Sequence, residues 1–203
     1  FCMRVVLGWR FDTRHGERFH EIRPAIFVAN HQSNLDLAIY GSIFPVRTAA
    51  IGKKEIRNLP LFGWLFTRSG NILIDRSNPA TAIASLEAVG RKMHAENLDV
   101  WMFPEGHRNQ GERLLPFKRG AFHLAASSGI PLVPVVCEPI GRVLDVQRLY
   151  VSPGTLRIEV LPPVATTGET AMDLSARVTE IMQAEVDRLG LLAKDRKAAR
   201  LRD

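Results

Sequence analysis

The chain has 203 residues, of which 46% are apolar and 24% charged, with 15 Gly and 12 Pro. This is the composition of one globular domain, and it excludes collagen-like, low-complexity and disordered chains. The net charge of +6 and the pI of about 9.8 favour an anionic partner: nucleic acid, an anionic membrane surface or a phosphorylated substrate.

Two cysteines, Cys2 and Cys137, are too few for a disulfide framework or a zinc site, so we expect reduced thiols in a cytosolic setting. No run approaches the ~18 consecutive apolar residues that a membrane-spanning helix needs. The first nine residues are mostly apolar and begin with Phe1 rather than Met. We therefore expect that a natural N-terminal segment, and with it a membrane anchor, precedes this chain.

Short apolar runs alternate with stretches of helical periodicity, which is typical of an α/β domain. Strands are expected at 25–29, 48–52, 71–74, 99–103, 130–137 and 156–160. Helices are expected at 35–44, from 79 onward, at 117–128 and at 173–199. The sequence thus predicts a single α/β domain, 1–203, with a mostly parallel central sheet flanked by helices and no internal linker.

Local residues mark several boundaries of these elements. Asn78-Pro79 predicts a capped helix start, Gly129 a helix end, and Ser33 or Asn34 an N-cap. The helix from 79 is expected to place four side chains on one apolar face: Ile83, Leu86, Val89 and Met93. Pro131 and Pro134 indicate the start or an irregular edge of their strand.

His31 is the first candidate for catalysis, because it directly follows a buried strand, at the sheet edge where open α/β folds bind ligands. Asp36 lies five residues on, and a carboxylate beside a histidine orients it as a general base. On a continuous helix the two side chains would diverge by about 140°. A turn through residues 32–34 is therefore required; otherwise His31 is a structural histidine near a helix cap.

The same spacing recurs at His94 and Asp99, so the spacing alone is weak evidence. His94 ends an amphipathic helix and Asp99 begins a strand, and we expect a solvated surface histidine there.

Two more clusters follow expected strands. Glu105 and Arg108 belong to Phe103–Arg108 and emerge beside His31 if their strands are parallel; otherwise this is a surface loop. Arg76 follows another strand, and a guanidinium suits bidentate phosphate binding. Further basic side chains, which are either part of an anion site or solvated charges, lie at element boundaries: Lys53, Lys54, Lys118 and Arg119.

Missing motifs narrow the chemistry. The sequence has no G-x-S-x-G elbow, no Walker loop and no dinucleotide glycine fingerprint. His15, His20 and Glu21 are close together but have no metal-ligand spacing. A base without an enzyme nucleophile predicts that a substrate hydroxyl attacks directly, with no metal.

Four blocks, in order, resemble the glycerolipid acyltransferases. They are Asn30–Asp36 (NHQSNLD), Gly70–Arg76 (GNILIDR), Phe103–Arg108 (FPEGHR) and Ile130–Pro134 (IPLVP), with the family-typical segments 51–55 and 116–122 between them. The similarity extends from about Ile26 to Val135. It implies the α/β fold of glycerol-3-phosphate acyltransferase and is greatest to the bacterial members that acylate 1-acyl-glycerol 3-phosphate (lysophosphatidic acid).

The resemblance also implies roles. His31 would take the proton of the sn-2 hydroxyl, with Asp36 orienting the ring, and the oxygen would attack the thioester of acyl-CoA or acyl-carrier protein to give phosphatidic acid. Arg76, Glu105 and Gly106 would position phosphate and glycerol. Weaker substrate-binding candidates are Arg108, Lys118, Gly70 and Lys53. Backbone N–H groups would stabilise the oxyanion, and no metal or cofactor is implied.

Two departures from the family pattern stand out. The third block usually continues Thr-Arg-Ser, whereas this chain has His107-Arg108-Asn109, which points to a shifted substrate preference at His107. Family members commonly begin with a hydrophobic helix or helix pair, of which at most the tail is present here.

With this function, the positive charge fits an anionic membrane surface, at the cytoplasmic face of the bacterial inner membrane. The segment 59–66 (LPLFGWLF) is a candidate for membrane insertion or an acyl groove, or else an ordinary buried helix. Four nearby basic residues are expected to hold the domain on the leaflet: Lys53, Lys54, Arg57 and Arg68.

Two rival functions remain open. One is an acyltransferase with another acceptor, either glycerol 3-phosphate or a lyso-ornithine lipid. The other is a non-catalytic basic module that binds nucleic acid or membrane, although the interleaved basic and aromatic pattern of nucleic-acid binding is missing, so no nucleic acid partner is expected.

Overall fold

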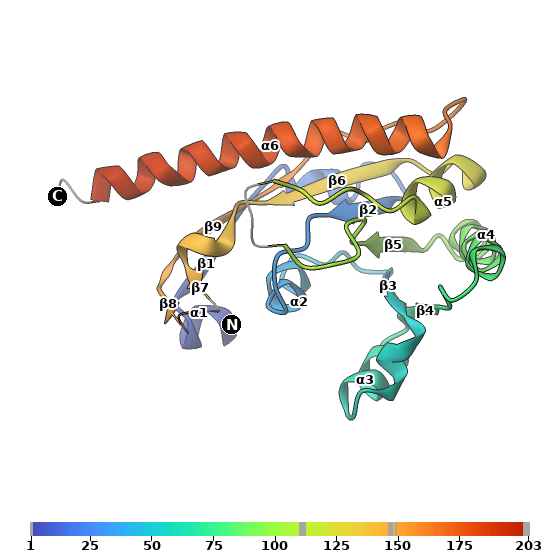
Figure 1. Cartoon of the computed structure of the whole chain (residues 1–203), viewed down its shortest axis with the longest axis horizontal. Coiled ribbons are helices and arrows are strands. Elements are labelled where there is room, and N and C mark those ends of the chain that lie inside the picture. Colours follow the sequence, from blue (N-terminus) through green and yellow to red (C-terminus); the bar gives the residue numbers. More distant parts are fainter. Residues whose placement is uncertain (1, 110–112, 146–147, 149, 201–203) are drawn as a thin grey trace.

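The computed structural model describes residues 2–109, 113–145, 148 and 150–200. A seven-stranded sheet, in the order β1-β9-β6-β2-β5-β3-β4, forms its centre (Figure 1). Its strands are β1 (Trp9–Arg14), β2 (Ile26–Ala29), β3 (Thr48–Lys53), β4 (Ile72–Ile74), β5 (Asp99–Met102), β6 (Leu132–Cys137) and β9 (Gly154–Val160). A separate hairpin pairs β7 (Leu144–Asp145) with β8 (Tyr150–Val151).

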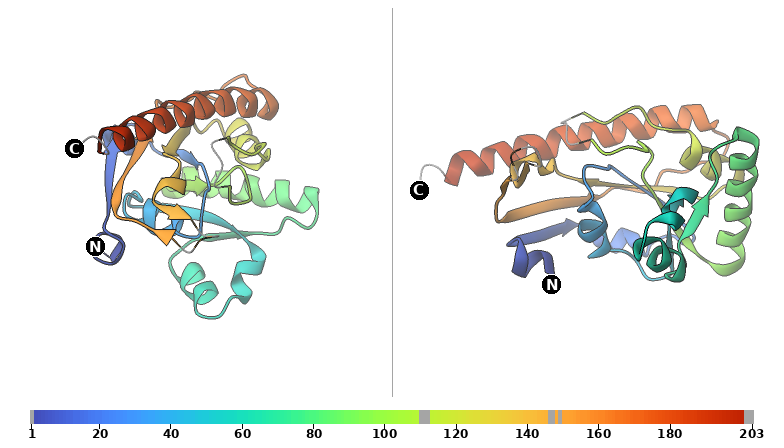
Figure 2. Two further views of the ribbon diagram at one scale, coloured as in Figure 1. Left: turned by 60° about the vertical axis from the view of Figure 1, so that its left-hand side comes forward. Right: turned by 60° about the horizontal axis from the view of Figure 1, so that its bottom comes forward.

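Helices surround this sheet (Figures 1 and 2). The α-helices are α1 (Cys2–Val6), α2 (Asp36–Gly41), α3 (Phe62–Arg68), α4 (Pro79–Glu96), α5 (Gly120–Ser128) and α6 (Ala171–Arg200), and the 3₁₀ turns are η1 (Gly16–Phe19), η2 (Lys54–Asn58) and η3 (Ile140–Arg142). No helix of the described residues is both long and apolar enough to cross a bilayer. The expected single α/β domain with a mostly parallel sheet is confirmed.

Side chains alternate between two cores on opposite faces of the sheet. On β2, Ile26 and Val28 join a core that α4, α5 and α6 cover. Phe27 and Ala29 point to the other face and pack among residues of α2, η1 and β1. All four residues are fully buried, which explains why β2 appears in the sequence as a continuous apolar run.

Strand directions bring together the sequence blocks that follow β2, β5 and β6. β2 pairs in parallel with β5 on one side and with β6 on the other, and β5 pairs in parallel with β3. Among the described residues, β6–β9 is the one antiparallel pair of this sheet. The segments after β2, β5 and β6 therefore leave the sheet at the same edge, and for the segments after β2 and β5 this confirms the prediction.

Helix boundaries follow the local chemistry in two cases. The Asn78 side chain accepts a hydrogen bond from the Ala80 N–H at 2.9 Å, with Pro79 in the first turn of α4. Gly129 ends α5 in the left-handed conformation. Both predictions are confirmed, although Ile83 is 43% exposed and does not belong to the buried face of α4.

Two other boundary predictions are wrong. α2 begins with Leu35 as its N-cap rather than Ser33 or Asn34, because the Ser33 hydroxyl accepts the Leu35 N–H within the preceding turn. Pro131 directly precedes β6, as predicted, whereas Pro134 lies inside this central strand instead of at its start or at an edge. It is tolerated because the β6–β9 ladder begins at Val135, and the Pro134 carbonyl still accepts the Leu161 N–H.

The N-terminal residues form structure that the sequence did not predict. Helix α1 leads into β1, which pairs in parallel with β9 from Trp9 to Arg14 at the edge of the sheet. Trp9 is fully buried and its indole N–H donates to the Ser152 carbonyl at 2.9 Å. Burial of this tryptophan anchors β1 to the rest of the sheet.

Candidate active site

The turn between β2 and α2 brings His31 and Asp36 together. His31 Nδ1 lies 2.7 Å from Asp36 Oδ2. Because a carboxylate only accepts, Nδ1 carries a proton and donates it, so in the neutral imidazole Nε2 is the unprotonated nitrogen, the one that can act as a base. The His31 side chain is 21% exposed, whereas that of Asp36 is 2% exposed, so the base is open to a ligand while its partner is shielded.

Asp36 organises the whole turn. The same oxygen also accepts the backbone N–H groups of Gln32 at 2.5 Å and Ser33 at 3.0 Å. Three donors to one buried carboxylate oxygen offset the free-energy cost of burying this group. The carboxylate therefore fixes both the imidazole ring and the backbone that carries it.

Two polar residues on either side of His31 fasten this turn to the end of β6, a role that the sequence reasoning missed. The Asn30 side chain donates to the Cys137 carbonyl at 3.0 Å and accepts the Cys137 N–H at 2.9 Å. The Gln32 side chain donates to the Glu138 carbonyl and accepts the Ile140 N–H. Their spacing, one residue before and one after His31, is the period-2 signal that could have revealed them.

Glu105 braces the same segment from β5. One carboxylate oxygen accepts the His31 backbone N–H at 2.8 Å and the other accepts the Leu115 N–H at 2.9 Å. Glu105 is 2% exposed, and this burial raises the pKa of its carboxyl group. The structure thus places Glu105 behind His31, bound to backbone N–H groups.

We expect Glu105→Gln to weaken this brace. An amide has one acceptor oxygen, so either the His31 or the Leu115 N–H loses a charge-assisted bond, at a cost of about 1–3 kcal/mol in the free energy of unfolding. A denaturant titration measures the loss, and the exposed Glu87→Gln on α4 is the matched control. Equal stability of both variants would contradict the bracing role.

Phe103 lies against His31 and lines two cavities. Its ring stacks on the imidazole with centroids 4.3 Å apart and planes at 20°. The first cavity, about 230 Å³, is mostly apolar and reaches Asp36. Side chains of α2, α3 and the sheet line it, among them Leu37, Tyr40, Phe44, Phe62, Leu65, Phe66 and Trp101. This cavity suits a hydrocarbon chain.

The second cavity, about 200 Å³, carries two cations. Arg76 and Lys118 line it together with Phe103, Pro104 and apolar side chains from α4 and α5. Although Arg76 is exposed overall, neighbouring atoms desolvate its guanidinium enough to lower its pKa, with Glu55 acting in the opposite direction. An arginine remains protonated under such a shift, so the cavity presents a positive charge suited to a phosphate.

The loop that follows Glu105 places Gly106 and His107 beside Lys118, which lines the second cavity. A Cβ on Gly106, whose φ is +69°, would come within 2.8 Å of the Lys118 side chain, so glycine lets that lysine pass close to the loop. Lys118 Nζ lies 3.4 Å from His107 Nε2. Arg108 instead donates to the Asn34 side chain and so links the Glu105 loop to the His31–Asp36 turn.

Two predicted binding residues lie apart from these cavities. Lys53 is exposed at the end of β3 and belongs to neither lining. Gly70, with a φ of +79°, forms the turn before β4, and its neighbours Ser69 and Asn71 line the apolar cavity. Lys54, the residue after Lys53, forms an ion pair with Asp75, with its Nζ 2.7 Å from Asp75 Oδ2.

The second histidine–aspartate pair with the five-residue spacing, His94 and Asp99, has a different environment. His94 is exposed and its Nε2 lies 2.9 Å from the Ser128 carbonyl. Asp99 is fully buried and holds the Ala25 N–H and Arg23 instead. These two residues form no pair, as expected from their context.

A covalent intermediate on Cys137 does not fit the structure. This thiol is 1% exposed, and burial raises its pKa well above the ordinary value, so the reactive thiolate is suppressed. The site therefore places His31 against Phe103, which lines both cavities, while the buried Cys137 thiol is unsuited to act as a nucleophile.

Comparison with known sequences agrees with this geometry. A family model described as "Acyltransferase" matches residues 10–138, more than half of the chain. The chain belongs to the acyltransferase family. The matched region contains the His31–Asp36 turn, the Glu105 loop and both cavities.

Relatives of this acyltransferase come from bacteria and animals. The chain is 35% identical over 187 residues to a Haemophilus influenzae protein named 1-acyl-sn-glycerol-3-phosphate acyltransferase, covering 91% of this chain and 77% of that one. It is 35% identical over 197 residues to the protein of the same name from Escherichia coli, covering 96% and 80%. Identity to the human beta form is 38% over 171 residues, covering 84% and 62%.

A solved structure has the same fold. The crystal structure of the 1-acyl-sn-glycerophosphate (LPA) acyltransferase PlsC from Thermotoga maritima superposes with a TM-score of 0.73 at 24% identity. The match covers 90% of this chain and 73% of that one. The α/β architecture is therefore shared along nearly the whole chain.

Proposed function

We propose that this acyltransferase moves a fatty acyl group from a thioester to the sn-2 hydroxyl of 1-acyl-glycerol 3-phosphate, forming phosphatidic acid. One observation carries the proposal: the His31 ring stacks on Phe103, and Phe103 lines both the apolar cavity and the cavity with Arg76 and Lys118. A lysophospholipid has one hydrocarbon chain, one phosphate and a free hydroxyl between them. The printed names of the relatives support this acceptor.

In the proposed reaction the acceptor phosphate lies near Arg76 and Lys118. The sn-2 oxygen gives its proton to His31 Nε2 and bonds to the thioester carbonyl carbon, and Asp36 stabilises the imidazolium. The tetrahedral intermediate collapses with cleavage of the C–S bond, and His31 returns the proton to the leaving thiolate. The products are 1,2-diacylglycerol 3-phosphate (phosphatidic acid) and the free thiol of CoA or acyl-carrier protein, and the chemistry calls for no metal.

We also propose that the enzyme works at an anionic membrane surface, on the cytoplasmic face of the bacterial inner membrane. Its lipid acceptor partitions into a bilayer, while its thioester donors are cytosolic. The net charge of +6 supports attraction to anionic lipid headgroups.

A panel of acceptors tests the proposed function. Purified enzyme receives labelled oleoyl-CoA with lysophosphatidic acid, glycerol 3-phosphate or a lyso-ornithine lipid, and products are identified by mass spectrometry. We expect phosphatidic acid to form fastest. Faster acylation of glycerol 3-phosphate or the lyso-ornithine lipid would show that lysophosphatidic acid is not the preferred acceptor. Binding of these lipids with no turnover of any acceptor would favour a non-catalytic module. A parallel reaction with oleoyl-acyl-carrier protein in place of oleoyl-CoA identifies the preferred donor.

Arg76→Met should weaken binding of the acceptor. Loss of a charge-assisted pair to phosphate, worth about 1.5–3 kcal/mol, should raise KM for lysophosphatidic acid on the order of 10- to 100-fold with kcat little changed. Arg91→Met, an exposed arginine on α4, is the control. An unchanged KM in Arg76→Met would remove Arg76 from the phosphate site.

A further inference from the structure

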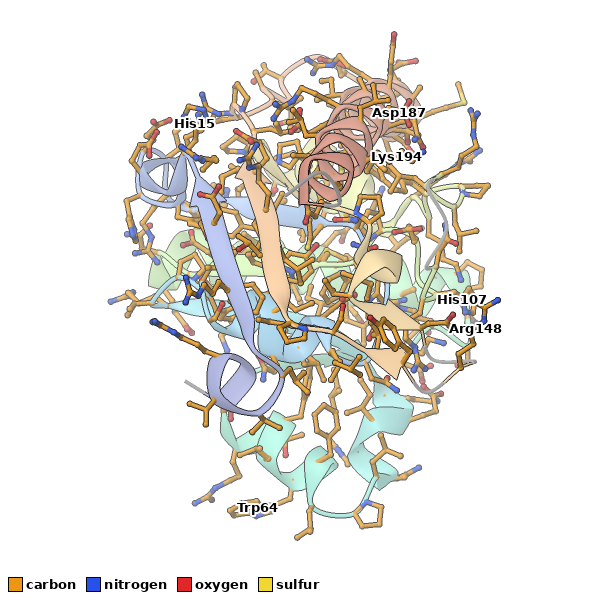
Figure 3. All side chains as sticks on the ribbon, turned by 90° about the vertical axis from the view of Figure 1, so that its left-hand side faces the viewer. His15, Trp64, His107, Arg148, Asp187 and Lys194 are labelled. Atoms are coloured by element: carbon orange, nitrogen blue, oxygen red, sulfur yellow. The ribbon has the colours of Figure 1, made fainter. Side chains whose placement is uncertain are left out.

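Large apolar side chains are exposed on the projection formed by η2, residues 59–61 and α3. Leu59, Leu61, Trp64 and Leu65 are 51%, 85%, 65% and 56% exposed. Figures 1 and 2 show α3 extending from the sheet on the side away from α6, and Figure 3 shows Trp64 at its tip. The alternative of an ordinary buried helix is therefore wrong for this segment: only Gly63 and Phe66 of α3 are buried.

This projection is firmly packed at its base. A Cβ on Gly63 would lie 2.4 Å from the Ile56 carbonyl oxygen, so α3 and η2 touch backbone to backbone. Phe66 is 8% exposed and fills the space above Gly52. Leu61, just before α3, has a φ of +58°, a conformation that is costly for leucine. A folded element thus holds Leu61, the most exposed of these four side chains, in strained backbone.

Basic residues surround the apolar tip. Arg57 and Arg68 are exposed, and the Arg68 guanidinium lies 5.9 Å from the centre of the Trp64 ring. Tryptophan beside cations is the composition found where proteins enter the headgroup region of an anionic bilayer.

The projection also forms one wall of the apolar cavity. Phe62, Leu65 and Phe66 line the cavity that reaches Asp36. An acyl chain in a bilayer that surrounded α3 would therefore meet the cavity wall without crossing water.

We propose that residues 59–68, the α3 wedge, insert into an anionic lipid bilayer and dock the apolar cavity against it. Trp64 and Leu61 enter the interface, and Arg57 and Arg68 bind lipid phosphates beside them. The inference rests on the proposed function only in taking a lipid as substrate, since the wedge itself is defined by exposure and charge.

Intrinsic fluorescence tests insertion directly. The chain has three tryptophans, and Trp9 and Trp101 are 0% and 1% exposed, so Trp64 reports alone on the surface. The whole chain is mixed with vesicles of phosphatidylethanolamine and phosphatidylglycerol, with and without bromine on the acyl chains. We expect a blue shift, quenching by brominated lipid and protection from acrylamide. Bound protein whose Trp64 stays open to acrylamide would overturn the proposal.

A matched pair of double variants measures the contribution of the wedge. Leu61→Ser with Trp64→Ser should lower vesicle affinity on the order of 10²-fold, because two large apolar side chains no longer leave water. Met172→Ser with Leu191→Ser on α6 removes side chains that are 62% and 64% exposed on the other side of the sheet and should change affinity by less than about twofold. Equal losses in both pairs would refute the wedge. Thermal melts confirm that all variants fold.

Activity separates this inference from the proposed function. With short-chain substrates below their micellar concentration, the Leu61/Trp64 variant should keep wild-type kcat/KM, while its rate on vesicle-borne lysophosphatidic acid falls. A comparable loss on monomeric substrate would overturn the docking role. If the wild type buries Trp64 in vesicles but transfers no acyl group, the wedge stands and the proposed function fails.

Discussion

His31→Ala should lower kcat on the order of 10²-fold or more, because the acceptor hydroxyl then has no positioned base. The fold should survive, since the imidazole is partly exposed and its hydrogen bond is to Asp36, which keeps two backbone donors. Thiol release from oleoyl-CoA with lysophosphatidic acid measures the rate, and a thermal melt checks the fold.

His94→Ala is the matched control for this variant. His94 has the same five-residue spacing to an aspartate but contacts Ser128 at the surface, so its removal should leave kcat unchanged. Near-wild-type turnover in a folded His31→Ala protein would end the mechanism proposed here.

Asp36 should respond differently to two substitutions. Asp36→Ala leaves the Gln32 and Ser33 N–H groups without an acceptor, which should cost about 2–4 kcal/mol and lower Tm by roughly 5–15 °C, together with loss of activity. Asp36→Asn keeps one acceptor oxygen but removes the negative charge that stabilises the imidazolium. It should lose less stability, with kcat still reduced on the order of 10²-fold or more.

Scanning calorimetry and steady-state kinetics on both variants measure this separation. Equal Tm for Asp36→Ala and the wild type would show that the carboxylate does not hold the turn. Full activity of Asp36→Asn would show that its charge is not needed by His31.

The sequence predicted the parts of the site that depend on neighbouring residues better than the parts that depend on contacts between distant segments. A turn at residues 32–34 was required for His31 to meet Asp36, and cap- and turn-forming residues occupy it. Parallel strands then follow from alternating strands and helices, and they bring Glu105 to the same edge.

Other features depend on partners far away in the chain. Glu105 was expected near substrate, but it binds the His31 N–H, a contact that its own loop does not encode. The role of Asn30 depends on Cys137, 107 residues later. The predicted role of Glu105 in positioning substrate therefore stays a prediction, with the bracing geometry now defined.

Strand β1 was missed, and for helix α3 the sequence left membrane insertion, an acyl groove and a buried helix open. The alternation in Trp9–Arg14 is short and interrupted by charges, and its pairing with β9 links residues 145 positions apart. In α3 the apolar run resembles a core helix, because hydrophobic composition does not say whether a side chain faces protein or lipid. Burial in the folded chain was needed to decide.

Direct attack by the acceptor on the thioester is the central claim, and rapid-mixing measurement of thiol release tests it most directly. Enzyme at substrate-like concentration is mixed with oleoyl-CoA, first alone and then with lysophosphatidic acid. We predict no thiol release without acceptor and continuous release with it, lost in His31→Ala. A burst of thiol equal to the enzyme concentration without acceptor would show an acyl-enzyme intermediate and contradict the account.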